Sequence, residues 1–273
     1  MHDTEHYKST SLLVIGDSHV EPEQDLSRFN ALGHLCLEHK PDIILSIGDF
    51  LSLDSLSAWD ADKKKTMEGK RYWDDVSSGN SALDALELPI TCYNSVQAQK
   101  KRAQYKPRKI FLKGNHEDRL DRYIEKNPIL DGAEISIEYN MNLHKRGWQV
   151  VQYKEHLVID DVAFTHIPIS NNGKPIGGKY VCQRALDLYN YSIVFGHTHR
   201  LEVANKHRHG GEHLQQSLNC GCFFDHVPDY MQGATTDYWR GVVLIDITQP
   251  MRFDIKTISM SHLMQEYRNH ETQ

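Results

Sequence analysis

The chain has 273 residues, of which 39% are hydrophobic and 25% are charged, and its formal net charge is −6 at pH 7. This composition is typical of a globular protein, and its acidic balance argues against a protein that coats nucleic acids. Because no apolar run reaches the roughly 18 residues of a membrane helix, the five cysteines are scattered and the first ten residues lack signal-peptide features, we expect a cytoplasmic protein with no membrane segment.

Short runs of β-branched and aromatic residues predict six buried strands, at residues 11–16, 42–48, 109–114, 161–166, 192–197 and 241–247. Between the first two runs, apolar residues at helical spacing from Leu26 to Leu35 predict a helix that covers parallel strands. From Val150 onward we expect consecutive strands and hairpins, with a turn at Gly210 and Gly211. No linker divides the chain, so residues 1–273 are predicted to form a single α/β domain with mixed sheets.

Potential metal ligands follow five of these predicted strands. A single Gly-Asp or a single histidine after a strand is usually an ordinary turn or a hydrogen-bonded side chain. The joint pattern indicates more, because the carboxyl ends of strands in α/β sheets form the crevice where ligands bind. We expect paired residues such as Asp17 and His19 to project to the same side of an extended segment. The residues at these ends are Asp17 and His19, Asp49, Asn115 and His116, His166, and His197 and His199.

The ordered set GD-S-H, GD, GNHE, a lone histidine and GHTH resembles the signature of calcineurin-like metallophosphoesterases, from Asp17 to His199. The resemblance implies an α/β fold that is a four-layer α-β-β-α sandwich, with two mixed sheets flanked by helices. It also implies an enzyme that hydrolyses phosphate esters with two metal ions, which an aspartate and a hydroxide bridge.

The resemblance also assigns site residues. Asp17, His19 and His199 would bind the first metal ion; Asn115, His166 and His197 would bind the second; and Asp49 would bridge the two. His116 would bind no metal but would donate a hydrogen bond or a proton to the leaving oxygen of the substrate. Asp54 and Asp118 are both candidates for the residue that orients His116.

Contacts with the substrate are predicted for Asn115 and Arg119. Arg119 and Arg122 follow the GNHE motif at helical spacing, and the alternative for both arginines is a solvated helix face.

The chemistry of the ligand types limits the choice of metal. Two dications neutralise the negative phosphate and activate water near neutral pH, and neutral imidazoles and an amide bind them without cancelling their charge. Mixed nitrogen and oxygen ligands suit transition metals better than Ca²⁺ or Mg²⁺. We therefore expect two divalent transition metal ions, with Mn²⁺ as the first choice and Fe, Zn²⁺ or Ni²⁺ as alternatives.

Residues 51–107 are predicted to form a basic and mostly helical insertion. Between residues 62 and 109, eleven Lys and Arg against six Asp and Glu give a charge of +5, which leaves −11 for the rest of the chain. Basic residues with the aromatic rings of Trp59, Tyr72 and Trp73 suggest a polyanion whose bases stack on the rings. The alternative is a helical hairpin with a charged exterior and tryptophans packed inward.

These features favour a phosphodiesterase that acts on a nucleotide or nucleic acid, which would make it a nuclease in the latter case. The alternative is a phosphomonoesterase that acts on a small molecule or a phosphoprotein. Protein phosphatases have less support, because Ser52 and Leu53 stand where their pattern has an acid and an arginine. A minor alternative is a scaffold that binds partners without catalysis. The sequence leaves the oligomeric state open.

Overall fold

The computed structural model describes residues 9–58, 62–132, 134–207, 214–226 and 236–271. Within these ranges, a six-stranded sheet has the order β11-β10-β1-β2-β3-β4. Strands β1 to β4 are parallel to one another, whereas β10 is antiparallel to both of its neighbours. The strands are β1 (Thr10–Ile15), β2 (Ile43–Ser46), β3 (Arg108–Leu112), β4 (Trp148–Val151), β10 (Gly241–Gln249) and β11 (Arg252–Ser259).

A second sheet, of five strands among the described residues, has the order β5-β6-β7-β9-β8. Its strands are β5 (Leu157–Ile159), β6 (Val162–Phe164), β7 (Ser192–Phe195), β8 (Leu201–His207) and β9 (Leu214–Cys220). Strands β6, β7 and β9 are parallel, and the outer strands β5 and β8 are antiparallel to their neighbours. Both sheets are therefore mixed, as predicted.

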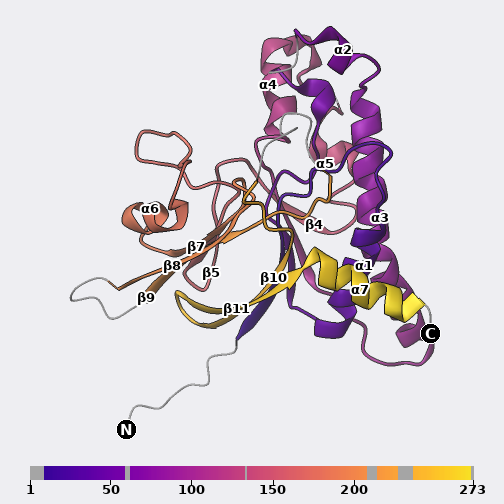
Figure 1. The fold of residues 1–273 in the computed structure, drawn as a ribbon. Coiled ribbons are helices and arrows are strands. Elements are labelled where there is room, and N and C mark those ends of the chain that lie inside the picture. Colours follow the sequence, from indigo (N-terminus) through magenta and orange to yellow (C-terminus); the bar gives the residue numbers. More distant parts are fainter. Residues whose placement is uncertain (1–8, 59–61, 133, 208–213, 227–235, 272–273) are drawn as a thin grey trace.

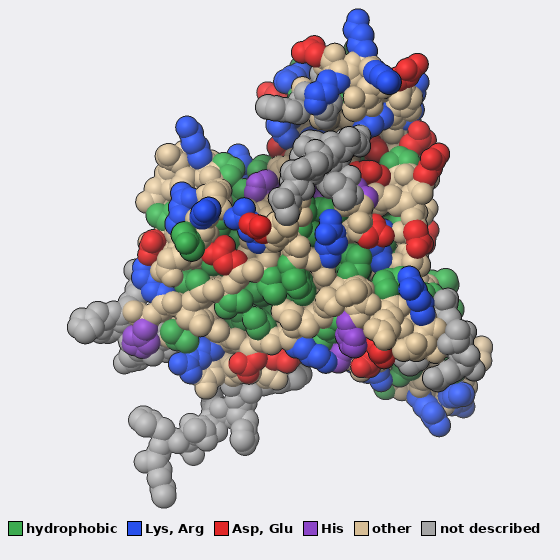
Figure 2. All heavy atoms as spheres, in the orientation of Figure 1, with side chains coloured by type: hydrophobic (Ala, Val, Ile, Leu, Met, Phe, Trp, Pro, Cys, Tyr) green, Lys and Arg blue, Asp and Glu red, His purple; other side chains and the backbone are tan. Residues whose placement is uncertain are grey.

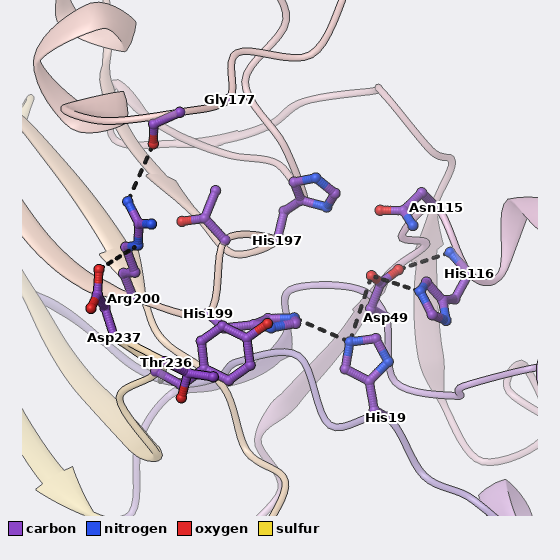
Figure 3. Close-up of a pocket in the computed structure, with 13 residues that line it drawn as sticks. His19, Asp49, Asn115, His116, Gly177, His197, His199, Arg200, Thr236 and Asp237 are labelled. Carbon is purple, nitrogen blue, oxygen red and sulfur yellow. Dashed lines mark hydrogen bonds and ion pairs between the residues drawn. The ribbon is translucent and has the colours of Figure 1, made fainter. Parts of the chain in front are cut away.

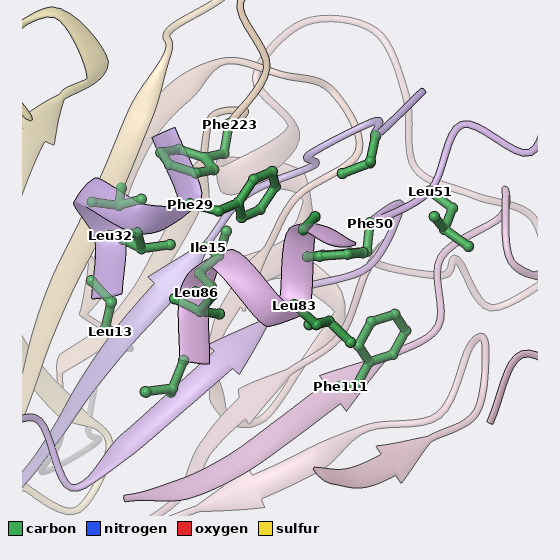
Figure 4. Packing of buried hydrophobic residues seen from close by; sticks show 14 of the residues in the cluster. Leu13, Ile15, Phe29, Leu32, Phe50, Leu51, Leu83, Leu86, Phe111 and Phe223 are labelled. Carbon is green, nitrogen blue, oxygen red and sulfur yellow. The ribbon is translucent and has the colours of Figure 1, made fainter. Parts of the chain in front are cut away.

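The side chains of β1 show how the layers form. Leu13 and Ile15 face the helices outside the first sheet, whereas Leu12 and Val14 alternate toward the second sheet. The outer helices of the first sheet are α1 (Ser27–His39), α3 (Tyr72–Gln99) and α7 (Met260–Glu271), and α6 (Val181–Leu188) covers the second sheet. Figure 1 shows these helices on opposite sides of the paired sheets, and Figure 4 shows the packing of the α1 and α3 side chains on β1. The predicted four-layer sandwich is confirmed.

All six predicted strands are present within two residues of the expected bounds, and the helix after β1 begins one residue after its expected start and ends four residues after its expected end. Strands β8 and β9 form an antiparallel pair, as expected for a hairpin, although the turn predicted at Gly210 and Gly211 lies outside the described residues. The remaining helices lie beside the carboxyl ends of the strands or in connections: α2 (Lys64–Met67), α4 (Asp118–Lys126), α5 (Ile137–Asn140) and the 3-10 turns Asp54–Leu56 and Pro128–Leu130. None of the described helices is long and apolar enough to cross a membrane.

The segment 51–107 is mostly helical, and its longest helix, α3, is part of the sandwich. The α3 residues Leu83 and Leu86 are buried in the same cluster as the residues of α1. The two helices approach closely, since a Cβ on Gly33 of α1 would lie 2.4 Å from the Leu86 carbonyl oxygen. Helix α2, which precedes α3 in this segment, lies at one end of the molecule near α4, where Figure 2 shows Lys and Arg side chains interspersed with Asp and Glu.

The aromatic residues of this segment differ in exposure. The Tyr72 side chain packs against the core and its hydroxyl donates to Asn140 Oδ1 at 2.7 Å, whereas Trp73 is 60% exposed. Trp59 lies outside the described residues. Inward packing is therefore wrong for Trp73.

Candidate metal centre

The loops after five strands bring the predicted site residues into one cluster, where the carboxyl ends of the two sheets meet. Figure 3 shows six of these residues around a single hollow, with side chains directed toward its centre: His19, Asp49, Asn115, His116, His197 and His199. Asp17 and His166 complete the cluster from below its surface, where both are almost fully buried. Every residue that the sequence pattern singled out at a strand end thus lies at this site.

Three of the residues form one candidate ligand group. Potential ligand atoms of Asp17, His19 and His199 all lie within 4.8 Å of one another. His199 Nε2 is 3.0 Å from Asp17 Oδ2 and 3.2 Å from His19 Nε2. Two imidazole nitrogens and a carboxylate oxygen that face one another at these distances are the donor set of a divalent transition metal.

A second group contains Asp49, His166 and His197, whose potential ligand atoms also lie within 4.8 Å of one another. His166 Nε2 is 3.3 Å from Asp49 Oδ2 and 3.0 Å from Asn115 Oδ1. The other ring nitrogen of His166 is 3.2 Å from the Ile47 carbonyl oxygen. Because that carbonyl accepts the Nδ1 hydrogen, Nε2 is the atom that faces the cluster.

Asp49 lies between the two groups. Its Oδ2 atom is 3.3 Å from His166 Nε2 and 3.9 Å from His19 Nε2, and it also belongs to a third group with His19 and His116. The Asp49 carboxylate therefore lies within 3.9 Å of a histidine from each of the two groups.

His116 is held by the backbone. Its Nδ1 atom lies 2.6 Å from the Ser52 carbonyl oxygen, and its Nε2 atom lies 3.2 Å from Arg119 Nη2 and 3.8 Å from Asp49 Oδ2. Neither proposed carboxylate orients the ring, since Asp118 pairs with Arg122 and Asp54 pairs with Lys70 and Arg119. The carbonyl fixes the neutral tautomer with hydrogen on Nδ1.

Arg119 packs beside His116 and does not lie on a solvated helix face. Its side chain is only 18% exposed. Its Nη1 atom donates to the carbonyl oxygens of Ser52 at 2.9 Å and Leu53 at 3.2 Å. Arg122 is different, because its side chain is 57% exposed and forms an ion pair with Asp118 at 2.8 Å.

The site residues converge through tight turns. His19, Asp49, His197 and His199 all have left-handed backbones, with φ between 40° and 70°. The prediction that the paired residues project from extended segments is therefore wrong, although they do reach a common volume. Left-handed conformations are uncommon for residues other than glycine and cluster at functional sites.

Two motif glycines leave room for the carboxylates. A Cβ on Gly114 would lie 2.1 Å from Asp49 Oδ1, and a Cβ on Gly196 would lie 2.3 Å from Asp17 Oδ1. Both contacts are shorter than any side chain tolerates, so glycine is required at these positions for close approach to the cluster.

Glu117 supports the centre, a role that the sequence analysis missed. The side chain is fully buried, and its carboxylate accepts the backbone N–H groups of Asp49 at 3.0 Å, Leu51 at 2.9 Å and Gly114 at 2.8 Å. It thereby joins the loops after β2 and β3. Burial, followed by the charge of Asp49, raises the pKa of Glu117 to about 7. An acid inside the GNHE motif, next to predicted site residues, was the available signal.

Burial and neighbouring charges shift the pKa values of the histidines in the cluster in different directions. Burial lowers the pKa of His166, but the Asp49 charge outweighs it and the net result is a pKa of about 9. Burial and the neighbouring His166 lower the pKa of His197 to about 4. Burial also lowers the pKa of His116, against the opposing effect of Asp49. Burial alone would raise the pKa of Asp49, but His166 and His116 hold it well below its usual range.

The donor set fits two divalent metal ions. His197 Nδ1 is buried and has no hydrogen-bond partner within the described parts of the chain, which is unusual for a polar atom. The two nitrogens of His19 and His199 face each other at 3.2 Å with Asp17 beside them. A cation bound by these nitrogen and oxygen atoms accepts their lone pairs, which otherwise face one another without a donor between them.

Two aromatic rings that the strand-end pattern does not contain lie against the histidines, one of them fully buried. The ring of Phe224 lies 5.2 Å from that of His19 and 5.1 Å from that of His199, and the ring of Tyr238 lies 4.6 Å from that of His199. These edge-on contacts shield one side of the cluster and fix the imidazole planes.

The fold and the cluster define a metal-dependent phosphoester hydrolase. The family model of calcineurin-like phosphoesterases matches residues 10–201, which is more than half of the chain. The protein therefore belongs to the calcineurin-like phosphoesterases, whose members are metallophosphoesterases that depend on a dinuclear metal centre.

Two solved structures show distant similarity. The chain is 14% identical to the Pseudomonas putida nuclease MPE, with 90% of this chain and 87% of that chain covered and a TM-score of 0.35. It is 9% identical to TT1561 of Thermus thermophilus, with 92% and 99% covered and a TM-score of 0.35. Among curated proteins, none matches this sequence.

Proposed function

We propose that this metallophosphoesterase hydrolyses phosphodiesters of nucleotides or nucleic acids. The observation that carries the proposal is that two hollows meet at Asn115. One, of about 470 Å³, surrounds the cluster and extends to Arg200 and Tyr238, and the other, of about 440 Å³, runs along α4 past Arg119. A diester carries a substituent on each side of its phosphorus, and the two hollows offer a place for both.

The proposed ligands form two sets, which the close approach of Asp17, His19 and His199 and of Asp49, His166 and His197 supports. Asp17, His19 and His199 hold one divalent cation; Asn115, His166 and His197 hold the other; and Asp49 contacts both, with Mn²⁺ the first choice and Fe, Zn²⁺ or Ni²⁺ the alternatives. When bound, two such cations act as Lewis acids that neutralise the phosphate and lower the pKa of water.

His116 is the proposed proton donor to the leaving oxygen. The Ser52 carbonyl holds the ring so that Nε2 faces the cluster, and Arg119 places a guanidinium 3.2 Å from that nitrogen. For the ring to donate a proton from Nε2, that nitrogen first takes up a proton from solvent and releases the Arg119 N–H that it accepts in the neutral ring, and the hydrogen bond from Nδ1 to the carbonyl stabilises the charged ring. Transfer of the proton to the leaving oxygen returns the ring to its neutral form. Because Arg119 Nη2 is 3.2 Å from His116 Nε2, the guanidinium can also contact the leaving oxygen to which His116 donates its proton.

A substrate panel tests the diester preference. Mn²⁺-loaded protein is assayed with bis(p-nitrophenyl) phosphate, p-nitrophenyl phosphate, cyclic nucleotides and short oligodeoxythymidylates. We expect larger kcat/KM values for the diesters than for the monoester. A protein that hydrolyses only the monoester would be a phosphomonoesterase, and the proposal would be wrong.

The variant His116→Gln tests the proposed proton transfer. Gln cannot donate a proton as an acid, so we expect unchanged metal content and a loss of about 10²-fold or more in kcat for oligodeoxythymidylates, whose alkoxide leaves poorly. The loss should be much smaller for bis(p-nitrophenyl) phosphate. The exposed His144, replaced by Gln, is the matched control. Lost metal would instead make His116 a ligand, and equal small losses on both substrates would remove it from proton transfer.

A further inference from the structure

We propose that the exposed face of α4 is a subsite for single-stranded nucleic acid, where Arg122 and Lys126 bind a phosphate beyond the scissile one and Tyr123 stacks on a base. The inference rests on the proposed function, because it concerns the part of a diester substrate that departs with the leaving oxygen.

The α4 hollow has the composition that a polyanion requires. It is lined by Asn115, Arg119, Arg122, Tyr123 and Lys126, together with residues 56–58. None of these described lining residues is acidic, so three cationic side chains face the same volume. Two of them pair with acids outside the lining, Arg119 with Asp54 and Arg122 with Asp118, so Lys126 is the lining cation whose charge no ion pair between described residues offsets.

Helical geometry aligns these side chains. Arg119, Arg122, Tyr123 and Lys126 are separated by three, four and seven positions, which places them on one face of α4. At 1.5 Å of rise per residue, the face extends about 10 Å from Arg119 to Lys126. A track of that length continues from the cluster past one phosphate and offers contacts to the next nucleotide.

The outer residues of this face are more exposed to solvent than Arg119, whose side chain is 18% exposed. Tyr123 is 46% exposed and is one of the large hydrophobic residues on the surface of the protein. Lys126 is exposed and takes part in none of the ion pairs between described residues. Arg122 is held beside Asn115 in the α4 hollow, because Asp118 pairs with it and its Nη2 donates to the Asn115 carbonyl oxygen at 3.0 Å.

The position of His116 decides which part of the substrate lies here. Arg119 touches His116 Nε2 and also lines the α4 hollow, so the hollow opens beside the imidazole that faces the leaving oxygen. The fragment that departs with that oxygen therefore lies along α4. A basic and aromatic track on this side serves a substrate with a charged, base-bearing leaving group.

A purely structural role would also place a lysine here, since Lys126 ends α4 and a cation is favourable at a helix C-terminus. The test therefore measures nucleic-acid binding directly. Fluorescence anisotropy of a labelled hexadeoxythymidylate is recorded over a range of salt concentrations with protein held in EDTA, so the readout does not depend on catalysis.

Two variants give different expected signatures. Lys126→Ala should weaken binding several-fold and reduce the slope of log K against log salt by about 0.7, the value for one phosphate contact on a single strand. Tyr123→Leu should weaken binding about tenfold with no change in the slope, because stacking carries no counterion release. Lys256→Ala, at an exposed lysine on β11, is the matched control and should bind as wild type.

Activity measurements then distinguish a failure of the α4 subsite from a failure of the proposed diesterase function. In Mn²⁺-loaded protein, the double variant Tyr123→Leu, Lys126→Ala should lose at least fivefold more kcat/KM on hexadeoxythymidylate than on bis(p-nitrophenyl) phosphate. If wild type cleaves the oligonucleotide but the variants bind and cleave it as wild type does, the subsite is wrong while the diesterase stands. Hydrolysis of monoesters alone by wild type would overturn both.

Discussion

Replacement of Glu117 tests whether a buried carboxylate assembles the metal centre. Its Oε2 atom accepts N–H groups from Asp49 and Gly114, and its Oε1 atom accepts the N–H of Leu51. In Glu117→Gln, the best orientation of the amide still turns its NH₂ group toward one of these donors. One buried N–H is left unsatisfied, at a cost of about 1–3 kcal/mol. Glu117→Ala leaves all three unsatisfied, and we expect a loss of at least about 3 kcal/mol.

The assay is urea unfolding in EDTA, followed by circular dichroism, with Mn²⁺ binding measured separately. Glu125→Ala, on the exposed side of α4, is the control and should change the unfolding free energy little. Since domains are stable by only about 5–15 kcal/mol, Glu117→Ala is expected to be marginal and Glu117→Gln remains the interpretable variant. Mn²⁺ affinity should also fall, because the joined loops carry Asp49 and Asn115. A Glu117→Gln protein with wild-type stability and Mn²⁺ affinity would refute the reasoning.

Chelation should abolish hydrolysis and added Mn²⁺ should restore it, and full activity of metal-free protein would contradict the dinuclear proposal. Asp49→Asn should lower the metal content of the protein measured by mass spectrometry. In Gly114→Ala, a Cβ 2.1 Å from Asp49 Oδ1 displaces that carboxylate, so we expect about a 10²-fold loss of activity, and a wild-type rate would show that the loop can shift without harm. Burial raises the pKa of Asp75, whose carboxylate accepts the Ser55 hydroxyl at 2.6 Å. The stability from this raised pKa is present at low pH and lost as pH rises, so Asp75→Asn should destabilise the protein more at pH 4 than at pH 7 in urea unfolding; a difference independent of pH would contradict this.

The strands and the positions of the site residues were predictable because both are local signals. Continuous apolar runs such as residues 12–15 mark buried parallel strands, and the residues directly after them must lie at one edge of the sheet. The sandwich and the assignment of roles came from the family resemblance, since no local pattern states how two sheets pack.

The remaining features depend on contacts between distant segments. Ser52 orients His116 through a backbone carbonyl, and every residue type has that group, so the sequence could not single it out. The role of Glu117 is defined by three N–H groups, two from the loop after β2 and one from its own loop, and the sequence does not show that these groups meet. Residues 51–107 looked like an insertion because the segment between the two strands is long, polar and basic, although Leu83 and Leu86 place its helix α3 in the core.

The two aspartates of the centre have a structural role besides the proposed metal binding, and this explains why the left-handed turns persist. The backbone N–H of His197 donates to both carboxylate oxygens of Asp17 at 3.0 Å, and the N–H of His116 donates to Asp49 Oδ1 at 2.8 Å. Each carboxylate thus holds the loop of another strand, and for Asp17 that strand is in the opposite sheet. Left-handed backbones cost about 1–3 kcal/mol each, and such charge-assisted bonds offset part of that cost. The turn at His197 therefore depends on the packing of both sheets, whereas the bond from His116 to Asp49 joins two loops of the first sheet, so the cluster needs contacts within one sheet as well as between the two.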